Sequence, residues 1–401
     1  MSRIAFVWEL GSSLGHLSVL LPFARKLKQR GHDVVIVLRE LQNVGSLFEE
    51  IPVLQAPLCL YQPKGLAEPP LSYSEILVRF GYSDAKGLAG LVGGWRALFA
   101  LHNSDLIVAD HSPTALLAAH SMGLAATTLG SGFYLPPSQN PLPNMRSWLN
   151  VPRERLEGSD AHVLTVMNTV LSTCGAKPLS AVYELFKTVE NFLCTFAELD
   201  HYPQREPSKY WGACYNLKMG QAAAWPNDAG LRVFVYLDPN GRDFINVLEA
   251  LTVLGCCAFV CAPGIAGKLR QQYESPRITI SAQPFRLDKL QKNCDLAIGY
   301  AGHAMTAGML MAGVPLLLLP RQLEQFLLAT RVAALGGAIT VNPDAPPPDY
   351  LAVIRMLVEE PAYRAAAKRF ASQYADFNQQ DQQEKIVDRI EQIAATKQAG
   401  A

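Results

Sequence analysis

The chain has 401 residues, more than one hydrophobic core usually organises, so its length predicts two domains. Hydrophobic residues make up 49% and charged residues 17% of the sequence, a composition that excludes a largely disordered chain. Lys plus Arg and Asp plus Glu balance at 35 each, so no net charge attracts nucleic acid or an anionic membrane, and neither is expected as a partner.

The apolar segments are too short and too interrupted to span a membrane. The longest, residues 307–319, contains two glycines and a proline and falls short of the roughly 20 residues that a spanning helix needs. The cysteine cluster Cys256, Cys257 and Cys261 has neither CxxC spacing nor a nearby histidine, which is typical of reduced, buried thiols. These features favour a cytoplasmic protein.

In the first half, short runs rich in Val and Ile alternate with amphipathic segments. We expect strands at 4–9, 33–38, 105–110 and 125–129, and helices at 18–30 and 113–122. This alternation predicts βαβ units and a doubly wound parallel sheet. The insertions 66–102 and 136–186 are typical of segments that form the wall of a binding site.

The periodic pattern lapses at 216–230, where small and turn-forming residues predict a linker between an N-terminal domain, 1–215, and a C-terminal domain, 231–375. The second domain repeats the first. We expect strands at 233–237, 258–261, 278–280, 295–298 and 315–319, and a helix at 244–254. The polar, helical tail, 376–401, is expected to cross back over the first domain.

A loop of the first domain carries residues suited to acid–base chemistry. Gly11 and Gly15 permit a tight turn that places His16 at the start of a helix, while Asp110 ends another strand. Both side chains are expected in one crevice, as an imidazole base and the carboxylate that orients it. Two alternatives stay open: His16 as a structural residue, and Asp110 as the N-cap of the helix at Pro113.

A second loop, GYAGHAMT at residues 299–306, leads from a strand into a helix of the second domain. Gly299 and Gly302 flank the helix entry, where free backbone amides are suited to hold a diphosphate. The sequence therefore predicts an anion site at this loop.

The segment GHLSVLLPFARKLKQRGHDVVIV, residues 15–37, resembles the opening of the UDP-glycosyltransferase and macrolide-glycosyltransferase family, whose usual form is GHxxPxxxLAxxLxxRGHxV. Gly15 and His16 match its first pair, although Val19 stands where the family has proline. The resemblance implies an α/β chain of the GT-B type, in which two Rossmann-like domains with doubly wound parallel sheets face a central cleft. It also implies that His16 is the catalytic base and that Asp110 pairs with it.

The second half resembles the same family between Asp295 and Val341, where the usual pattern is DxxxxHGGxGTxxEALxxGVPxxxxPxxxDQxxxAxxxxxxGxG. Glu324 and Gln325 stand at its Asp-Gln pair, which binds hydroxyl groups of the donor sugar in the family. The resemblance then implies donor contacts from Gly15 and from Tyr300, Gly302, His303, Ala304, Met305 and Thr306.

The chain departs from the family pattern where the donor's phosphates bind. The family's diphosphate-binding His is Tyr300 here, and its ribose-binding Glu falls at Gly308. The strand end that usually offers a phosphate contact is Asp238 followed by proline, which removes one backbone donor and adds a negative charge. We expect His303 to supply the missing cation and Phe285 to stack on the nucleotide base.

These features predict an inverting glycosyltransferase that moves a sugar from a nucleoside-diphosphate donor to a small, partly hydrophobic acceptor. No Asp-x-Asp sequence occurs, so neither a metal nor another cofactor is expected, and helix amides with Tyr300 or His303 would meet the leaving charge. Acceptor contacts are expected from apolar and aromatic residues that suit an ordinary core equally well: Phe133, Tyr134, Met145 and Trp148.

Other functions stay open at this point. The main alternative is a non-enzymatic GT-B scaffold or small-molecule binder, because the changes at Asp238, Tyr300 and Gly308 are unfavourable to a diphosphate. The lipid-linked GlcNAc transferases share the fold, but their glycine loop GGTGGH is absent, and neither domain opens with the GxGxxG of a dinucleotide-dependent oxidoreductase. A monomer or weak dimer is expected.

Overall fold

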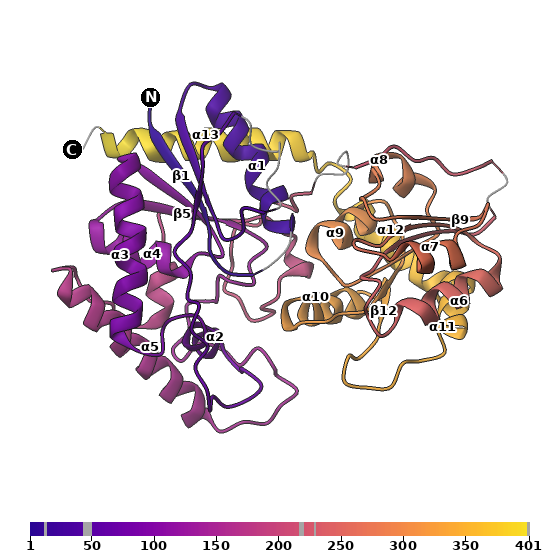
Figure 1. Ribbon diagram of the computed structural model, residues 1–401, viewed down its shortest axis with the longest axis horizontal. Coiled ribbons are helices and arrows are strands. Elements are labelled where there is room, and N and C mark those ends of the chain that lie inside the picture. Colours follow the sequence, from indigo (N-terminus) through magenta and orange to yellow (C-terminus); the bar gives the residue numbers. More distant parts are fainter. Residues whose placement is uncertain (12–13, 43–49, 216–219, 228–229, 399–401) are drawn as a thin grey trace. The chain divides into compact units, whose positions relative to one another are not determined.

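The chain divides into two compact units in the computed structural model, which describes residues 1–11, 14–42, 50–215, 220–227 and 230–398. Unit 1 comprises Met1–Phe196, Tyr202–Gly212 and Asn378–Ala401, and unit 2 comprises Ala197–His201 and Ala213–Phe377. The expected linker, 216–230, lies partly outside the described residues. Each unit is built on its own six-stranded sheet (Figure 1).

Unit 1 contains a parallel sheet in the order β3-β2-β1-β4-β5-β6. The central strands β1 and β4 are apolar and buried along almost their whole length, as expected for strands of a sheet that is covered on both faces. The strands are β1 (Arg3–Trp8), β2 (Asp33–Leu38), β3 (Val53–Gln55), β4 (Leu106–Asp110), β5 (Ala125–Gly130) and β6 (Glu190–Leu193).

Helices fill the connections between these strands. They are α1 (Leu14–Gln29), α2 (Tyr73–Arg79), α3 (Ala85–His102), α4 (Pro113–Met122), α5 (Arg153–Thr173) and the 3-10 helix Val182–Phe186. Both α2 and α3 begin at a residue whose side chain accepts a backbone N–H of the first turn, Ser72 and Asp84 respectively.

The C-terminal helix α13 (Gln379–Gln398) also belongs to unit 1, where it runs beside α1 (Figure 1). Its apolar side is buried in the unit, and Ile390 is fully covered. Its polar side pairs with Arg30, whose guanidinium lies 2.6 Å from Glu384, 2.7 Å from Asp388 and 2.6 Å from Glu391. The end of the chain therefore completes the unit that its beginning forms.

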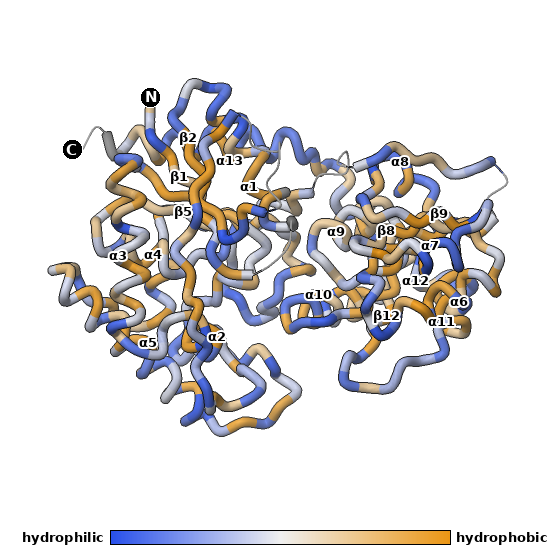
Figure 2. Tube along the Cα trace, in the orientation of Figure 1, coloured by the Kyte–Doolittle hydropathy of each residue, from blue (hydrophilic) through white to orange (hydrophobic). Residues whose placement is uncertain are grey.

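Unit 2 has a second parallel sheet in the order β12-β11-β10-β7-β8-β9. Its strands are β7 (Arg232–Tyr236), β8 (Cys257–Cys261), β9 (Ile278–Ser281), β10 (Leu296–Gly299), β11 (Leu316–Leu318) and β12 (Ala338–Thr340). Hydrophobic residues line the strands of both sheets (Figure 2).

The helices of unit 2 are α6 (Phe244–Leu254), α7 (Gly267–Tyr273), α8 (Leu287–Leu290), α9 (His303–Met311), α10 (Leu323–Ala334), α11 (Tyr350–Glu359) and α12 (Pro361–Gln373), with 3-10 helices at Ala197–Leu199 and Gln291–Asn293. The predicted fold class, two doubly wound parallel sheets, is confirmed. The strand β2 and the helices α4 and α6 also have the bounds that the sequence predicts.

One boundary differs in a way that matters for the site. The first helix, expected at 18–30, begins at Leu14, so Gly15 and His16 lie in its first turn and not in the preceding loop. None of the helices in the described part of the chain is both long enough and apolar enough to cross a membrane. All eight cysteines are free.

Candidate active site

The ends of β1 and β4 bring His16 and Asp110 together. The two strands are neighbours in register, with Trp8 opposite Asp110, and α1 opens shortly after β1. His16 Nδ1 lies 2.9 Å from Asp110 Oδ2, and only 14% of the His16 side chain and 1% of the Asp110 side chain are exposed. In the tautomer whose Nδ1–H donates to Asp110 Oδ2, Nε2 is the basic nitrogen of the ring.

Asp110 does not cap the helix that follows it. The N-cap position of α4 is Ser112, whose side chain makes no capping hydrogen bond. The Thr114 N–H instead donates to Glu9 Oε2 at 2.9 Å. The interpretation of Asp110 as an N-cap is therefore wrong, because a carboxylate that follows β1 occupies the start of α4.

Aromatic packing fixes the imidazole of His16. The buried Trp8 stacks on it, with ring centroids 4.9 Å apart and planes 21° from parallel. The Trp8 indole N–H donates to Leu10 O at 2.6 Å, which sets the orientation of the indole. Trp8 and Glu9 were not predicted as site residues from the sequence, although their place at the end of the first strand is a signal that could have identified them.

His111 directly follows Asp110 and adopts a positive φ of 44°. Its ring stacks on Tyr134 with centroids 4.8 Å apart. Burial, with His16 nearby, holds the pKa of His111 well below its usual range, so its imidazole is neutral at physiological pH. A neutral ring at this place adds no positive charge beside His16.

Gly11 leaves space beside the basic nitrogen of His16. Its φ is +87°, a left-handed conformation that glycine adopts without strain. A Cβ at this position would lie 2.6 Å from His16 Nε2. The missing side chain therefore avoids a clash with the nitrogen that would accept a substrate proton.

The residues predicted to contact an acceptor differ in exposure: Phe133 6%, Tyr134 5%, Met145 4% and Trp148 49%. The Tyr134 ring lies 6.4 Å from that of His16, and its hydroxyl donates to Leu129 O at 3.3 Å. Gly130 permits this approach, because a Cβ there would lie 1.2 Å from the Tyr134 hydroxyl and 3.1 Å from Asp110 Oδ1. Tyr134 is therefore packed beside the His16–Asp110 pair.

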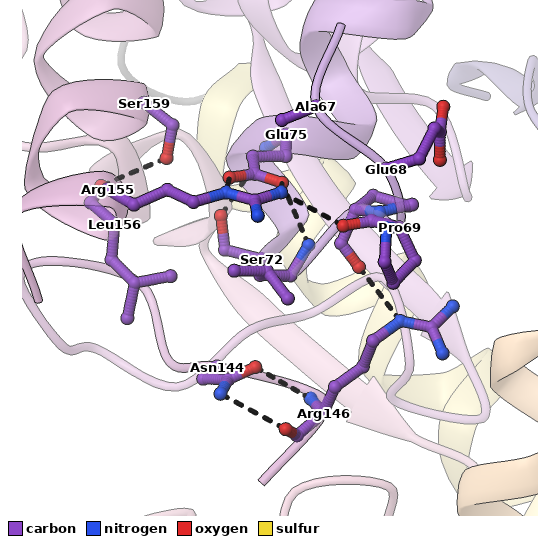
Figure 3. Close-up of polar contacts among 12 residues, drawn as sticks. Ala67, Glu68, Pro69, Ser72, Glu75, Asn144, Arg146, Arg155, Leu156 and Ser159 are labelled. Carbon is purple, nitrogen blue, oxygen red and sulfur yellow. Dashed lines mark hydrogen bonds and ion pairs between the residues drawn. The ribbon is translucent and has the colours of Figure 1, made fainter. Parts of the chain in front are cut away.

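The loop that carries Met145 is fixed to the segment before α2 by polar contacts. Arg146 Nε donates to Pro70 O at 3.1 Å, as Figure 3 shows. In the same view Arg155 of α5 donates to both carboxylate oxygens of Glu75 on α2, at 2.7 and 2.8 Å. These contacts join α2, α5 and the loop into one wall of unit 1.

Three neighbouring strands of unit 2 end at one edge of its sheet. Tyr236 of β7 and Leu318 of β11 both lie opposite Gly299 of β10. In open parallel sheets this carboxyl-end edge is where ligands bind. Tyr300 follows β10, and its hydroxyl accepts the Asp238 N–H at 2.5 Å, so the backbone donor at the end of β7 is already paired within the unit.

Helix α9 begins at this edge, with Gly302 at its N-cap position and His303 as its first residue. The turn continues through Ala304, Met305 and Thr306, of which Thr306 is fully buried. Burial lowers the pKa of His303 to about 4, although Asp200 acts in the opposite direction. Without a donor, His303 is therefore neutral at pH 7, and its contact with the donor's phosphates stays a prediction.

Phe285 belongs to the interior of unit 2. It is 5% exposed and packs edge-on against Phe259, with centroids 5.2 Å apart, and Phe259 packs in turn against Trp225. The expectation that Phe285 stacks on a nucleotide base is wrong, because core packing occupies its ring.

Glu324 and Gln325 lie in the first turn of α10. Gln325 Oε1 accepts the Arg321 N–H at 2.9 Å, which fixes the backbone at the helix start. Glu324 stands where the helix dipole favours a carboxylate. Within the described residues, no group of three or more His, Cys, Asp or Glu side chains is arranged to hold a metal ion.

Comparisons with known proteins agree with this architecture. Residues 279–393 match the family model of the erythromycin biosynthesis protein CIII-like C-terminal domain. A comparison with curated proteins finds no match. Among solved structures, glycosyltransferase VinC in complex with dTDP has a TM-score of 0.71 at 16% identity, over 98% of this chain and 100% of VinC.

Two further structures are similar along the whole chain. The calicheamicin glycosyltransferase CalG4 has a TM-score of 0.72 at 14% identity, over 98% of each chain. The Streptomyces sp. SF2575 glycosyltransferase SsfS6, complexed with thymidine diphosphate, has a TM-score of 0.63 at 19% identity, over 98% of this chain and 100% of SsfS6. The chain therefore has the GT-B fold of these glycosyltransferases, and its residues 279–393 match the family model of the erythromycin biosynthesis protein CIII-like C-terminal domain.

Proposed function

We propose that the chain is an inverting, metal-independent glycosyltransferase that moves a sugar from a nucleoside-diphosphate donor to a small, partly hydrophobic acceptor. The observation that carries the proposal is the hydrogen bond between His16 Nδ1 and the buried carboxylate of Asp110 at the strand ends of unit 1. With Nδ1 held by Asp110, Nε2 is the ring nitrogen that would act as the general base.

In this mechanism His16 Nε2 accepts the proton of an acceptor hydroxyl, amine or thiol. The acceptor atom then attacks the anomeric carbon of the donor, the bond from that carbon to the diphosphate breaks, and the nucleoside diphosphate leaves. A single displacement inverts the configuration of this carbon. The Asp110 carboxylate stabilises the imidazolium that forms, which lowers the energy of the transition state relative to an isolated histidine.

We assign donor binding to unit 2 and acceptor binding to unit 1. Two observations support the donor assignment: the family match at 279–393 includes the loop before α9 and the start of α10, and two similar structures, VinC and SsfS6, hold thymidine diphosphate. Thymidine diphosphate is therefore the first nucleotide to test. The buried aromatic residues around His16 favour an acceptor with an apolar surface next to its reacting group.

The specific observation that favours the alternative, a non-enzymatic binder, is the bond between Tyr300 and the Asp238 N–H. It occupies a backbone donor at the strand end where the resemblance implies a phosphate contact. Catalysis and simple binding then differ in one consequence: only the enzyme breaks the bond between sugar and diphosphate.

The test incubates the purified protein with dTDP-, UDP- and GDP-glucose and a panel of small aromatic and macrocyclic alcohols, in buffer that contains EDTA. Glycosides and released nucleoside diphosphate are measured by mass spectrometry, and NMR reports the anomeric configuration of the product. We expect an inverted glycoside from the wild type and none from His16→Ala. A folded protein that binds a nucleotide but never releases its sugar would support the binder instead.

A further inference from the structure

The carboxyl-end edge of unit 2 contains a cation that the family pattern does not include. Arg321 follows β11, and its Nη1 donates to Asp238 Oδ2 at 2.5 Å. Its guanidinium carbon lies 5.3 Å from the centre of the Tyr300 ring. The three residues follow three adjacent strands, β7, β10 and β11, so the ion pair lies where ligands bind in open parallel sheets.

This ion pair is too exposed to matter much for stability. The side chain of Arg321 is 51% exposed and that of Asp238 is 34% exposed. Exposed pairs of this kind contribute little to stability, so separating the two charges has a small energetic cost. Asp238 also keeps partners after a separation, because its Oδ1 accepts the Asn240 N–H at 2.9 Å.

The guanidinium, in contrast, is well prepared to bind an oxyanion. The planar fork of arginine binds phosphate oxygens through two parallel hydrogen bonds, and stacking on an aromatic ring holds that plane in one orientation. Tyr300 supplies the ring here. His303, in the same region, is neutral at pH 7 and brings no charge.

We propose that Arg321 is the phosphate-binding residue of the donor site, and that the donor's diphosphate replaces the Asp238 carboxylate on its guanidinium. The inference rests on the proposed donor binding in unit 2. Asp238 then acts as an internal competitor: it holds the guanidinium over Tyr300 in the free protein and lowers the affinity for the nucleotide. The cation that the family supplies through its histidine comes from the end of the next strand in this chain.

The test measures binding by calorimetry in EDTA, with dTDP, UDP and GDP and with the matching nucleosides thymidine, uridine and guanosine. We expect Arg321→Gln to weaken binding of the preferred diphosphate about 10- to 100-fold, because a charge-assisted bond to phosphate is lost. Arg321→Lys keeps the charge without the fork and should weaken binding by a smaller factor. Binding of the nucleoside, which has no phosphate, should be the same in all three proteins.

Asp238→Asn distinguishes an Arg321 that binds phosphate from an Arg321 that only stabilises the structure. Removing the competing carboxylate should tighten diphosphate binding about three- to tenfold. The gain should shrink in the double variant with Arg321→Gln, because most of it depends on the freed guanidinium. A structural ion pair predicts the opposite for Asp238→Asn, namely unchanged or weaker binding.

Arg364→Gln is the matched control. Arg364 pairs with Asp295, the residue just before β10, at the opposite edge of the same sheet, so its loss removes an Arg–Asp pair far from the proposed phosphate. Thermal unfolding confirms that each variant is folded. If the wild type binds a diphosphate and Arg321→Gln binds it equally well, the role of Arg321 is overturned and the proposed function is not. If the folded wild type binds none of the three diphosphates, the proposed function and this inference are overturned together.

Discussion

The Glu9 carboxylate accepts the backbone N–H of Thr114 at 2.9 Å, so a buried acid from the end of one strand caps the helix that follows the neighbouring strand. Burial raises the pKa of Glu9 from 4.5 to about 7. Between these two pH values the folded protein holds a proton that the unfolded chain has lost. Glu9 should therefore lower the free energy of unfolding as the pH rises from about 4.5 to about 7, by about 3 kcal/mol in total.

Glu9→Gln should remove this pH dependence while its amide oxygen still accepts the Thr114 N–H. Denaturant unfolding at pH 5 and pH 8 measures the effect as the difference between variant and wild type, which cancels the other titrating groups. Glu154→Gln, a change at an exposed position of α5, is the control and should leave the pH dependence of unfolding unaltered. Parallel pH curves for the wild type and Glu9→Gln would show that Glu9 has an ordinary pKa.

Asp110→Asn should reduce kcat about 10²- to 10⁴-fold with little change in the KM for the donor. The carboxylate stabilises charge that develops on His16 during transfer, and its role begins after the donor is bound. The rate of nucleoside diphosphate release, measured at saturating donor, checks this. Asp105→Asn, a change just before the amino end of the same strand, is the matched control and should retain most of the activity. Equal losses in both variants would indicate a general effect on β4.

The fold was predictable from the sequence because its determinants are local. Alternating apolar strands and amphipathic helices repeat along both halves, and parallel βαβ units follow from that pattern alone. The start of α1, expected at residue 18, lies at Leu14, and glycine at position 15 is a poor helix former that gives no sign of it.

The site was only partly predictable, because its chemistry depends on contacts between distant segments. The role of Asp110 was undecided from spacing, and Glu9, far from α4 in the sequence, removes one alternative by capping that helix. The charge of His303 depends on its burial, which a motif does not show. Arg321 lies outside the matching motif positions, and only the adjacency of β7, β10 and β11 brings it to Asp238.

Arg155→Ala should destabilise unit 1 by about 2 kcal/mol. Glu75 is largely buried and accepts both hydrogen bonds from Arg155 (Figure 3), so the truncation leaves a buried carboxylate without its counter-charge. Thermal unfolding measures the loss. The comparison is Arg153→Ala, which breaks an exposed pair with Glu157 on the same helix and should cost less than about 0.5 kcal/mol. Similar losses of stability for Arg155→Ala and Arg153→Ala would show that the burial of Glu75 does not strengthen its pair with Arg155.

The attachment of α13 should depend on its apolar side more than on its ion pairs. Ile390 is fully buried, and Ile390→Ala should cost about 2–4 kcal/mol through lost packing and the cavity left behind. Arg30→Gln removes ion pairs that are partly exposed and should cost about 1 kcal/mol or less. Denaturant unfolding at 0.1 M and 1 M salt distinguishes the two, because salt should weaken the effect of Arg30→Gln alone. A larger loss of unfolding free energy for Arg30→Gln than for Ile390→Ala would show that ion pairs are the main attachment of α13.

Gly11→Ala should abolish most of the transfer activity while the protein stays folded. The new Cβ would lie 2.6 Å from His16 Nε2, closer than non-bonded atoms approach, so it displaces the imidazole or fills the space where the acceptor's proton must arrive. Gly31→Ala is a close control: its φ is also +87°, and nothing lies within 4 Å of its Cβ position. Both variants carry the same backbone strain, about 1 kcal/mol, and Gly11→Ala should lose somewhat more stability in thermal unfolding because its Cβ also displaces the imidazole. Only Gly11→Ala should lose activity by 100-fold or more in the nucleoside diphosphate release assay. If both variants keep their activity, His16 Nε2 does not accept the acceptor's proton from the side of Gly11.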